Sequence, residues 1–154
     1  MEDNLPVTPP NTDTPLMQMV HPNVMLEWVD DRTIAILTVT SIQREAISAW
    51  ADKAVEIVST RPEGQPHLVI HDVSAPSLTL TPYIRERAQY AVSHYPESGG
   101  RTAVVVPKGL SGSVLKLFIN QLMRIVRGRP TKAFFSRDEA LMWVRAELAD
   151  GQDD

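Results

Sequence analysis

Two patterns of apolar residues alternate along the chain. In the first, branched and aromatic residues follow one another in short runs, which is typical of β-strands. In the second, apolar residues recur every three or four positions, which predicts amphipathic helices. Runs of the first kind at 24–29 and 33–39 are separated by the turn-forming residues Asp30, Asp31 and Arg32. We therefore expect the fold to begin with a β-hairpin.

The later part of the chain repeats a strand followed by a helix. Apolar runs at 67–71, 102–106 and 132–135 predict three further strands. Helices are predicted before the first of these strands and after each of them. Their inner faces are expected to be Ile47, Trp50, Ala54, Ile57 and Val58; Ile84, Ala88, Ala91 and Val92; Val114, Leu117, Phe118, Leu122, Ile125 and Val126; and Ala140, Leu141, Val144 and Leu148. The order predicts an α/β fold in which the hairpin precedes βαβ units, giving a mixed, mostly parallel sheet of about five strands with four helices.

The ends of the chain differ in composition from its centre. Residues 1–20 are rich in proline and acidic residues, and we expect them to form a disordered arm. Residues 22–149 are expected to form a single α/β domain, since 154 residues suit one hydrophobic core. Residues 150–154 are expected to be a short acidic tail.

Composition narrows the classes of function. The chain has no cysteine, which excludes disulfides, thiolate metal sites and cysteine nucleophiles. Its four histidines show no metal-ligand spacing, so neither a metal site nor another cofactor is expected. The start of the chain lacks the basic and apolar regions of a signal peptide, and no apolar run is long enough to span a bilayer. We therefore expect a cytoplasmic protein that does not span the membrane.

Three stretches, 68–74, 101–122 and 133–143, resemble the STAS-like superfamily, in particular its SpoIIAA-like and STAS/SEC14-type bacterial domains. The resemblance covers roughly 24–148, and its motifs are structural. It implies a non-enzymatic regulatory module that binds another protein in a bacterium. The alternative that it implies is a carrier of a lipid or another small apolar ligand.

The loop after the strand at 67–71 is the first candidate site. Asp72, Ser74, Ser77, Thr79 and Thr81 gather at the carboxyl end of a central strand, where open α/β sheets often bind ligands. In the anti-sigma-factor antagonists of the STAS-like superfamily, a serine or threonine at the start of the next helix is phosphorylated, and Thr81 occupies that position. The chain departs from their D-S-S-G motif, because 80–83 read Leu-Thr-Pro-Tyr. Alternatively, Thr81 is an N-cap and the other hydroxyls belong to an ordinary loop.

The loop after the strand at 102–106 is the second candidate site. Lys108, Gly109, Ser111, Gly112 and Ser113 join that strand to a helix, and backbone N–H groups in such a loop can bind an anion. The sequence matches neither a P-loop nor the G-x-S-x-G motif of hydrolases. A structural turn is the main alternative, and a hydrolase using Ser111 is a distant one, so no catalytic residue is assigned.

The third candidate site is a basic surface. Residues 99–136 include seven lysines and arginines and no acidic residue. Four of them, Lys116, Arg124, Arg127 and Arg129, are expected to form a basic interaction face on and after the third helix. Such a face suits an acidic protein or a phospholipid headgroup, or is simply solvated. Specific nucleic-acid binding is not expected, because aromatic residues are sparse and no reading motif is present. Half-exposed Met142 and Trp143 leave a homodimer open.

Overall fold

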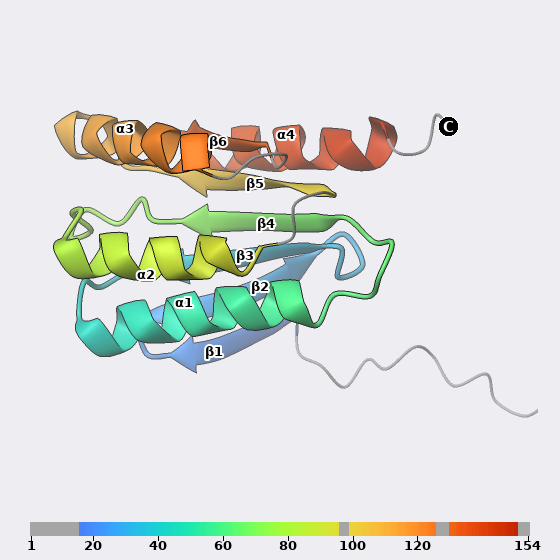
Figure 1. Ribbon diagram of the computed structural model, residues 1–154, viewed down its shortest axis with the longest axis horizontal. Coiled ribbons are helices and arrows are strands. Elements are labelled where there is room, and N and C mark those ends of the chain that lie inside the picture. The colour runs from blue at the N-terminus through green and yellow to red at the C-terminus, as the bar shows by residue number, and fades with distance from the viewer. Residues whose placement is uncertain (1–15, 96–98, 126–129, 151–154) are drawn as a thin grey trace, which may run out of the picture.

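The computed structural model describes residues 16–95, 99–125 and 130–150, except for the side chains of 123–125 and 149–150. Strands and helices follow the chain in this order: β1 (Met17–His21), β2 (Val24–Val29), β3 (Ile34–Val39), α1 (Arg44–Ser59), β4 (His67–Asp72), α2 (Pro82–Ser93), β5 (Gly100–Val105), α3 (Leu110–Ile125), β6 (Thr131–Phe134) and α4 (Arg137–Asp150). The strands form one sheet in sequence order, from β1 at one edge to β6 at the other (Figure 1).

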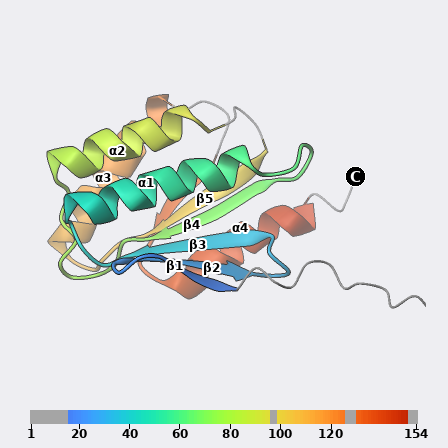
Figure 2. The same ribbon diagram turned by 90° about the horizontal axis from the view of Figure 1, so that it is seen from below.

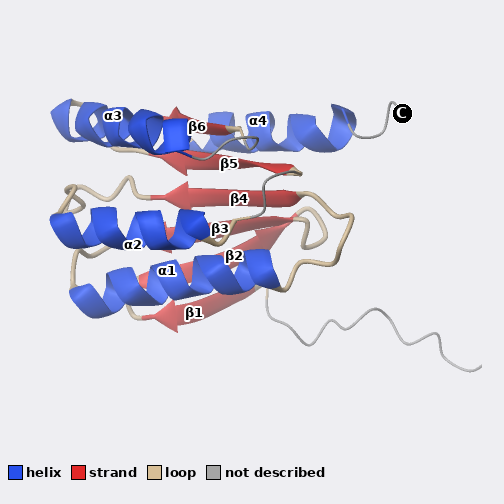
Figure 3. Ribbon diagram, in the orientation of Figure 1, coloured by secondary structure: helices blue, strands red, loops and turns tan. Residues whose placement is uncertain are grey.

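The sheet is mixed and mostly parallel. Strands β1, β2 and β3 pair antiparallel, and β3, β4, β5 and β6 pair parallel. Each parallel connection contains a helix, as βαβ geometry requires (Figure 3). The predicted α/β class, the N-terminal hairpin and the four helices are thus confirmed.

Helices cover the two faces of the sheet unequally. Helices α1, α2 and α3 lie on one face, and α4 lies alone on the other (Figure 2). Because successive strand residues point to opposite faces, Leu37 and Val69 pack with Trp50 beneath α1, whereas Ile36 and Ile70 pack beneath α4. Apolar clusters on both faces thus enclose the sheet, and a third cluster, formed by Val106, Leu115 and Ile119, packs α3 against the end of β5.

Strand β1 corrects the prediction for the N-terminal arm. Residues 17–20 were expected to be disordered, but they belong to a strand that pairs with β2, and this makes six strands rather than five. The backbone N–H of Trp28 also donates to the carbonyl of Leu16. Prolines at 15 and 22 flank this strand closely, so its pattern of apolar residues is too short to predict a strand from the sequence. Residues 1–15 and 151–154 lie outside the described residues, and Asp150, assigned to the tail, ends α4.

Helix α3 is rotated from the orientation that was predicted. Val114 and Leu117 were expected to face the core, but both are exposed, and Leu115 and Ile119 are buried instead. Gly112 explains the rotation, because its backbone packs so closely on the carbonyl of Pro107 that an added Cβ would lie 1.6 Å from that oxygen. Of the other predicted inner residues, Phe118 is buried and Leu122 is partly buried. The side chains at 125 and 126 lie outside what the structure describes.

The hairpin turn between β2 and β3 is strained. Asp30, Asp31 and Arg32 have φ angles of 53°, 55° and 64°, in the left-handed region that most residues avoid. Thr33 closes the turn through its N–H and hydroxyl, which both donate to the carbonyl of Asp30. Arg145 of α4 donates two hydrogen bonds to the Asp30 carboxylate, at 2.7 and 2.9 Å. The turn is therefore attached to the helix on the far face of the sheet.

Candidate functional site

The carboxyl end of β4 is tied to α4 by one arginine. The Arg137 guanidinium donates to Asp72 at 2.8 and 3.2 Å, to Thr38 at 2.9 Å and to Glu27 at 3.3 Å. These three partners lie on the neighbouring strands β4, β3 and β2, and Thr38 is paired directly with Asp72. Asp72 also accepts hydrogen bonds from the N–H and the hydroxyl of Ser74, at 3.1 and 2.6 Å.

These contacts determine the protonation state of Asp72. Burial alone disfavours the charged form of this carboxyl, but the hydrogen bonds from Ser74 and Arg137 outweigh it, and they hold the pKa of Asp72 below its ordinary value. The carboxylate is therefore negative at neutral pH and fully occupied by its neighbours. Asp72 and Ser74, predicted as part of a switch loop, act here as a structural junction between three strands and α4.

The rest of the 72–81 loop divides into capping and exposed hydroxyls. Thr81 Oγ1 accepts from the N–H of Ile84 at 3.1 Å and so caps α2, with Pro82 in the first turn, as the alternative interpretation predicted. Ser77 is exposed and donates to the carbonyl of Thr40 at 3.0 Å. Thr79 is also exposed, and it lines a pocket described below. The five predicted residues therefore do not converge on one point.

The loop before α3 has a structural explanation for each of its glycines. Gly109 has a φ of 97°, and Gly112 makes the close approach to Pro107. Ser113 donates both its N–H and its hydroxyl to the carbonyl of Gly109. Lys108 and Ser111 are exposed, and among the described residues Ser111 makes no hydrogen bond to a histidine or a carboxylate.

The outer surface of α3 is apolar as well as basic. Lys116 is exposed, and its Nζ lies 5.7 Å from the centre of the Phe135 ring. Leu110, Val114 and Leu117 are 88%, 52% and 63% exposed. Of the predicted basic face, the side chain of Arg124 and all of Arg127 and Arg129 lie outside the described residues. The sequence prediction recognised the charge of this helix but placed two of these apolar side chains in the core.

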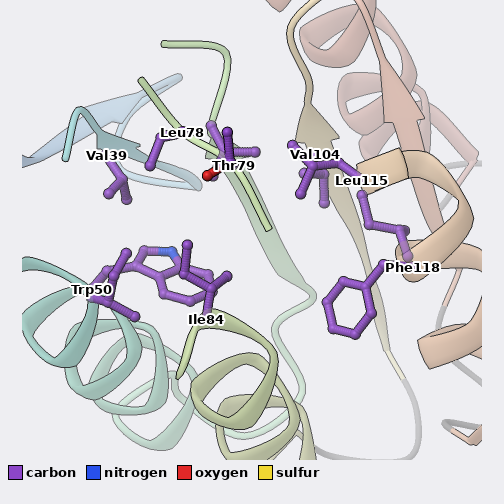
Figure 4. Close-up of a pocket in the computed structure, with 11 residues that line it drawn as sticks. Val39, Trp50, Leu78, Thr79, Ile84, Val104, Leu115 and Phe118 are labelled. Carbon is purple, nitrogen blue, oxygen red and sulfur yellow. The ribbon is translucent and has the colours of Figure 1, made fainter. Parts of the chain in front are cut away.

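Two adjoining apolar pockets lie between α2 and α3, over β4 and β5. Their volumes are about 70 and 90 Å³. Figure 4 shows the smaller one, with Trp50 and Ile84 on one side, Leu115 and Phe118 on the other, and Thr79 near its rim. The two pockets share five wall residues, namely Trp50, Val73, Val104, Phe118 and Ile119.

A chain of polar groups crosses the wall of the larger pocket. Trp50 Nε1 donates to His71 Nδ1 at 3.0 Å, and His71 Nε2 lies 3.1 Å from the hydroxyl of Tyr95. Because an indole N–H only donates, His71 Nδ1 must accept, so a neutral ring carries its proton on Nε2 and donates it to Tyr95. Thr102, also in this wall, is 3% exposed, and its hydroxyl has no hydrogen-bond partner among the described residues.

Only partial signals for these features are present in the sequence. Thr102 and His71 stand as polar residues within apolar runs, which marks them as unusual, but no pattern shows that α2 and α3 leave space above them. No pattern in the sequence marked Arg137 as a site residue. The described residues contain no group of three or more histidines and carboxylates that could hold a metal ion. None of their helices has the length and apolarity needed to cross a bilayer.

Comparison of the chain with protein-family models, with curated proteins and with solved structures finds no match. The resemblance to the STAS-like superfamily accordingly remains a prediction.

Proposed function

We propose that the protein is a non-enzymatic interaction module that binds another protein through the outer face of α3. The observation that carries this proposal is the exposure of Leu110, Val114 and Leu117. Their spacing of four and three residues places them on one side of the helix, so they form a continuous apolar stripe, here called the α3 stripe. Large apolar side chains gathered on a surface are typical of interaction sites.

Charge indicates the kind of partner. Helix α3 contains no acidic residue, exposed Lys108 precedes the α3 stripe, and exposed Lys116 neighbours Leu117 in the sequence. The wider segment 99–136 has only basic charges. An apolar stripe beside lysines complements a protein surface with an apolar centre and an acidic rim, because such a rim steers association and favours the correct register. This acidic, apolar surface is the partner that we propose.

The proposal places binding on α3 rather than on a phosphorylated Thr81. The Thr81 hydroxyl already caps α2, and Asp72 and Ser74 hold the sheet to α4. Phosphorylation of Thr81, a bacterial source and a cytoplasmic location stay predictions. The apolar pockets between α2 and α3, of about 70 and 90 Å³, are far below what a phospholipid needs, so they support the carrier alternative only for a small molecule.

Site-specific crosslinking tests this function. A photoreactive amino acid replaces Leu117 in one variant and Met142 in the control variant, and both are expressed in the source organism. Met142 is a matched control because it is 72% exposed on α4, on the opposite face of the sheet. We expect one crosslinked protein at 117, lost when Leu110 and Val114 are changed to serine, and none at 142.

Three other results would overturn the proposal. A crosslink at 117 only to a second copy of the chain would make the α3 stripe a dimer interface. Binding of the purified protein to anionic phospholipid vesicles, without a protein adduct, would make it a membrane-docking surface. Equal adducts at 117 and 142 would show that the stripe has no special role.

A further inference from the structure

The Thr102 hydroxyl is the feature of the larger pocket that its protein surroundings leave unexplained. Thr102 lies on β5, on the same face of the sheet as His71 and Val104, and it lines the pocket. Its side chain is almost completely buried, and Oγ1 has no partner among the described residues. An unpaired hydroxyl in an apolar site is unfavourable, whereas one that hydrogen-bonds a group inside the pocket is not.

The other residues that line the two pockets limit which chemical group can hydrogen-bond Thr102. Neither pocket is lined by a lysine, arginine, aspartate or glutamate. A charged ligand would therefore lose its hydration without gaining a counter-ion, which is strongly unfavourable. The ring nitrogens of His71 are engaged by Trp50 and Tyr95. Among the polar residues that line the pockets, Thr102 is the one whose buried side-chain oxygen has no partner among the described residues, so it is the group that we assign to orienting a ligand.

Size limits the ligand further. The two pockets, of about 70 and 90 Å³, share the walls formed by Trp50 and Phe118. Together they are comparable with an engineered apolar cavity of ~150 Å³ that binds benzene. A single ring with one small substituent matches this combined volume, and Trp50 of α1 and Phe118 of α3 supply aromatic walls for it.

We propose that the space between α2 and α3 is a binding site for a small neutral aromatic molecule whose one polar group hydrogen-bonds Thr102. The site is separate from the α3 stripe, since the pocket is lined by the inner residues of α3 and the stripe is formed by its outer residues. The ligand class is a phenol or a compound of similar size and polarity. Of the candidate site residues predicted from the sequence, Thr79 lines the smaller pocket, and none of the others lines either pocket.

Titration with three probes tests the site in the full-length chain. Phenol carries the ring and a hydroxyl, benzene carries the ring alone, and benzoate adds a charge. Binding is followed through the indole N–H resonance of Trp50, which lines both pockets, and by calorimetry. We expect saturable binding of phenol with one site per chain, weaker binding of benzene and no binding of benzoate.

Two substitutions at Thr102 separate a specific polar contact from general apolar binding. Thr102→Val keeps the branched shape and removes the hydroxyl, so phenol should bind roughly three- to tenfold more weakly while benzene is unaffected. Thr102→Ser keeps the hydroxyl and should retain the preference for phenol over benzene. Absence of saturable shifts at Trp50, or equal phenol affinity in Thr102→Val and the natural chain, would overturn the proposal. Neither result bears on crosslinking at the α3 stripe.

Discussion

Replacement of Arg137 by glutamine tests how strongly the carboxyl end of the sheet depends on α4. Arg137 connects α4 to Asp72, Thr38 and Glu27 through four hydrogen bonds, and a glutamine side chain at this position is too short, and uncharged, to replace them. The change leaves the Asp72 carboxylate buried without its cation. Breaking a fully buried ion pair costs about 3–5 kcal/mol, because the remaining charge is uncompensated.

The expected cost is smaller than that limit for two structural reasons. The side chain of Arg137 is 39% exposed, so water compensates part of the loss, although that of Asp72 is only 10% exposed. Asp72 also keeps both hydrogen bonds from Ser74. We therefore expect Arg137→Gln to lower the free energy of unfolding by about 2 kcal/mol.

Arg145→Gln is the matched control, because Arg145 lies on the same helix and also holds an aspartate with two hydrogen bonds. Its side chain and that of Asp30 are 48% and 32% exposed, so we expect a loss of less than about 1 kcal/mol. Urea unfolding at pH 7 followed by circular dichroism measures both variants. Equal losses, or a larger loss for Arg145→Gln, would refute the argument that the burial of Asp72 makes the Arg137 contact important.

Three further predictions concern single residues. The folded-state pKa of Asp72 lies below its ordinary value of 3.8. The stabilisation that its carboxylate contributes is therefore present above that value and is lost as pH falls through the lower folded-state pKa. When the free energy of unfolding is measured at decreasing acidic pH, it should fall less steeply in Asp72→Asn than in the natural chain. Thr102→Val removes an unpaired hydroxyl, so without added ligand it should raise the free energy of unfolding, measured by urea titration, by about 1 kcal/mol. A decrease would indicate that the Thr102 hydroxyl has a hydrogen-bond partner within the protein. Leu115→Ala should lower stability by about 2–5 kcal/mol because Leu115 is buried, whereas Leu117→Ala should change it by less than about 0.5 kcal/mol; similar losses in thermal unfolding would contradict the observed rotation of α3.

The parts of the fold that the sequence predicted well are those with one dominant pattern. Continuous apolar runs predicted β3, β4 and β5, since a strand buried on both faces has few alternatives. Strand β1 was missed because five residues between two prolines carry too little pattern, and its pairing with β2 is a tertiary contact. Arg137 and Thr102 were missed as site residues for the same reason, since their importance depends on which side chains the folded chain brings beside them.

Helix α3 shows why periodicity alone could not locate the interaction surface. The buried residues Leu115, Phe118 and Ile119 and the exposed residues of the α3 stripe both recur at helical spacing, so the helix has two apolar faces. Either face satisfies the pattern of a core helix. The contact between Gly112 and Pro107 decides between them, and it depends on the path of the loop after β5. The face left outside then presents apolar side chains that no part of the described chain covers. For that reason, the protein-binding proposal depends on the rotation of α3, and the ligand proposal depends on the side chains that this rotation turns inward.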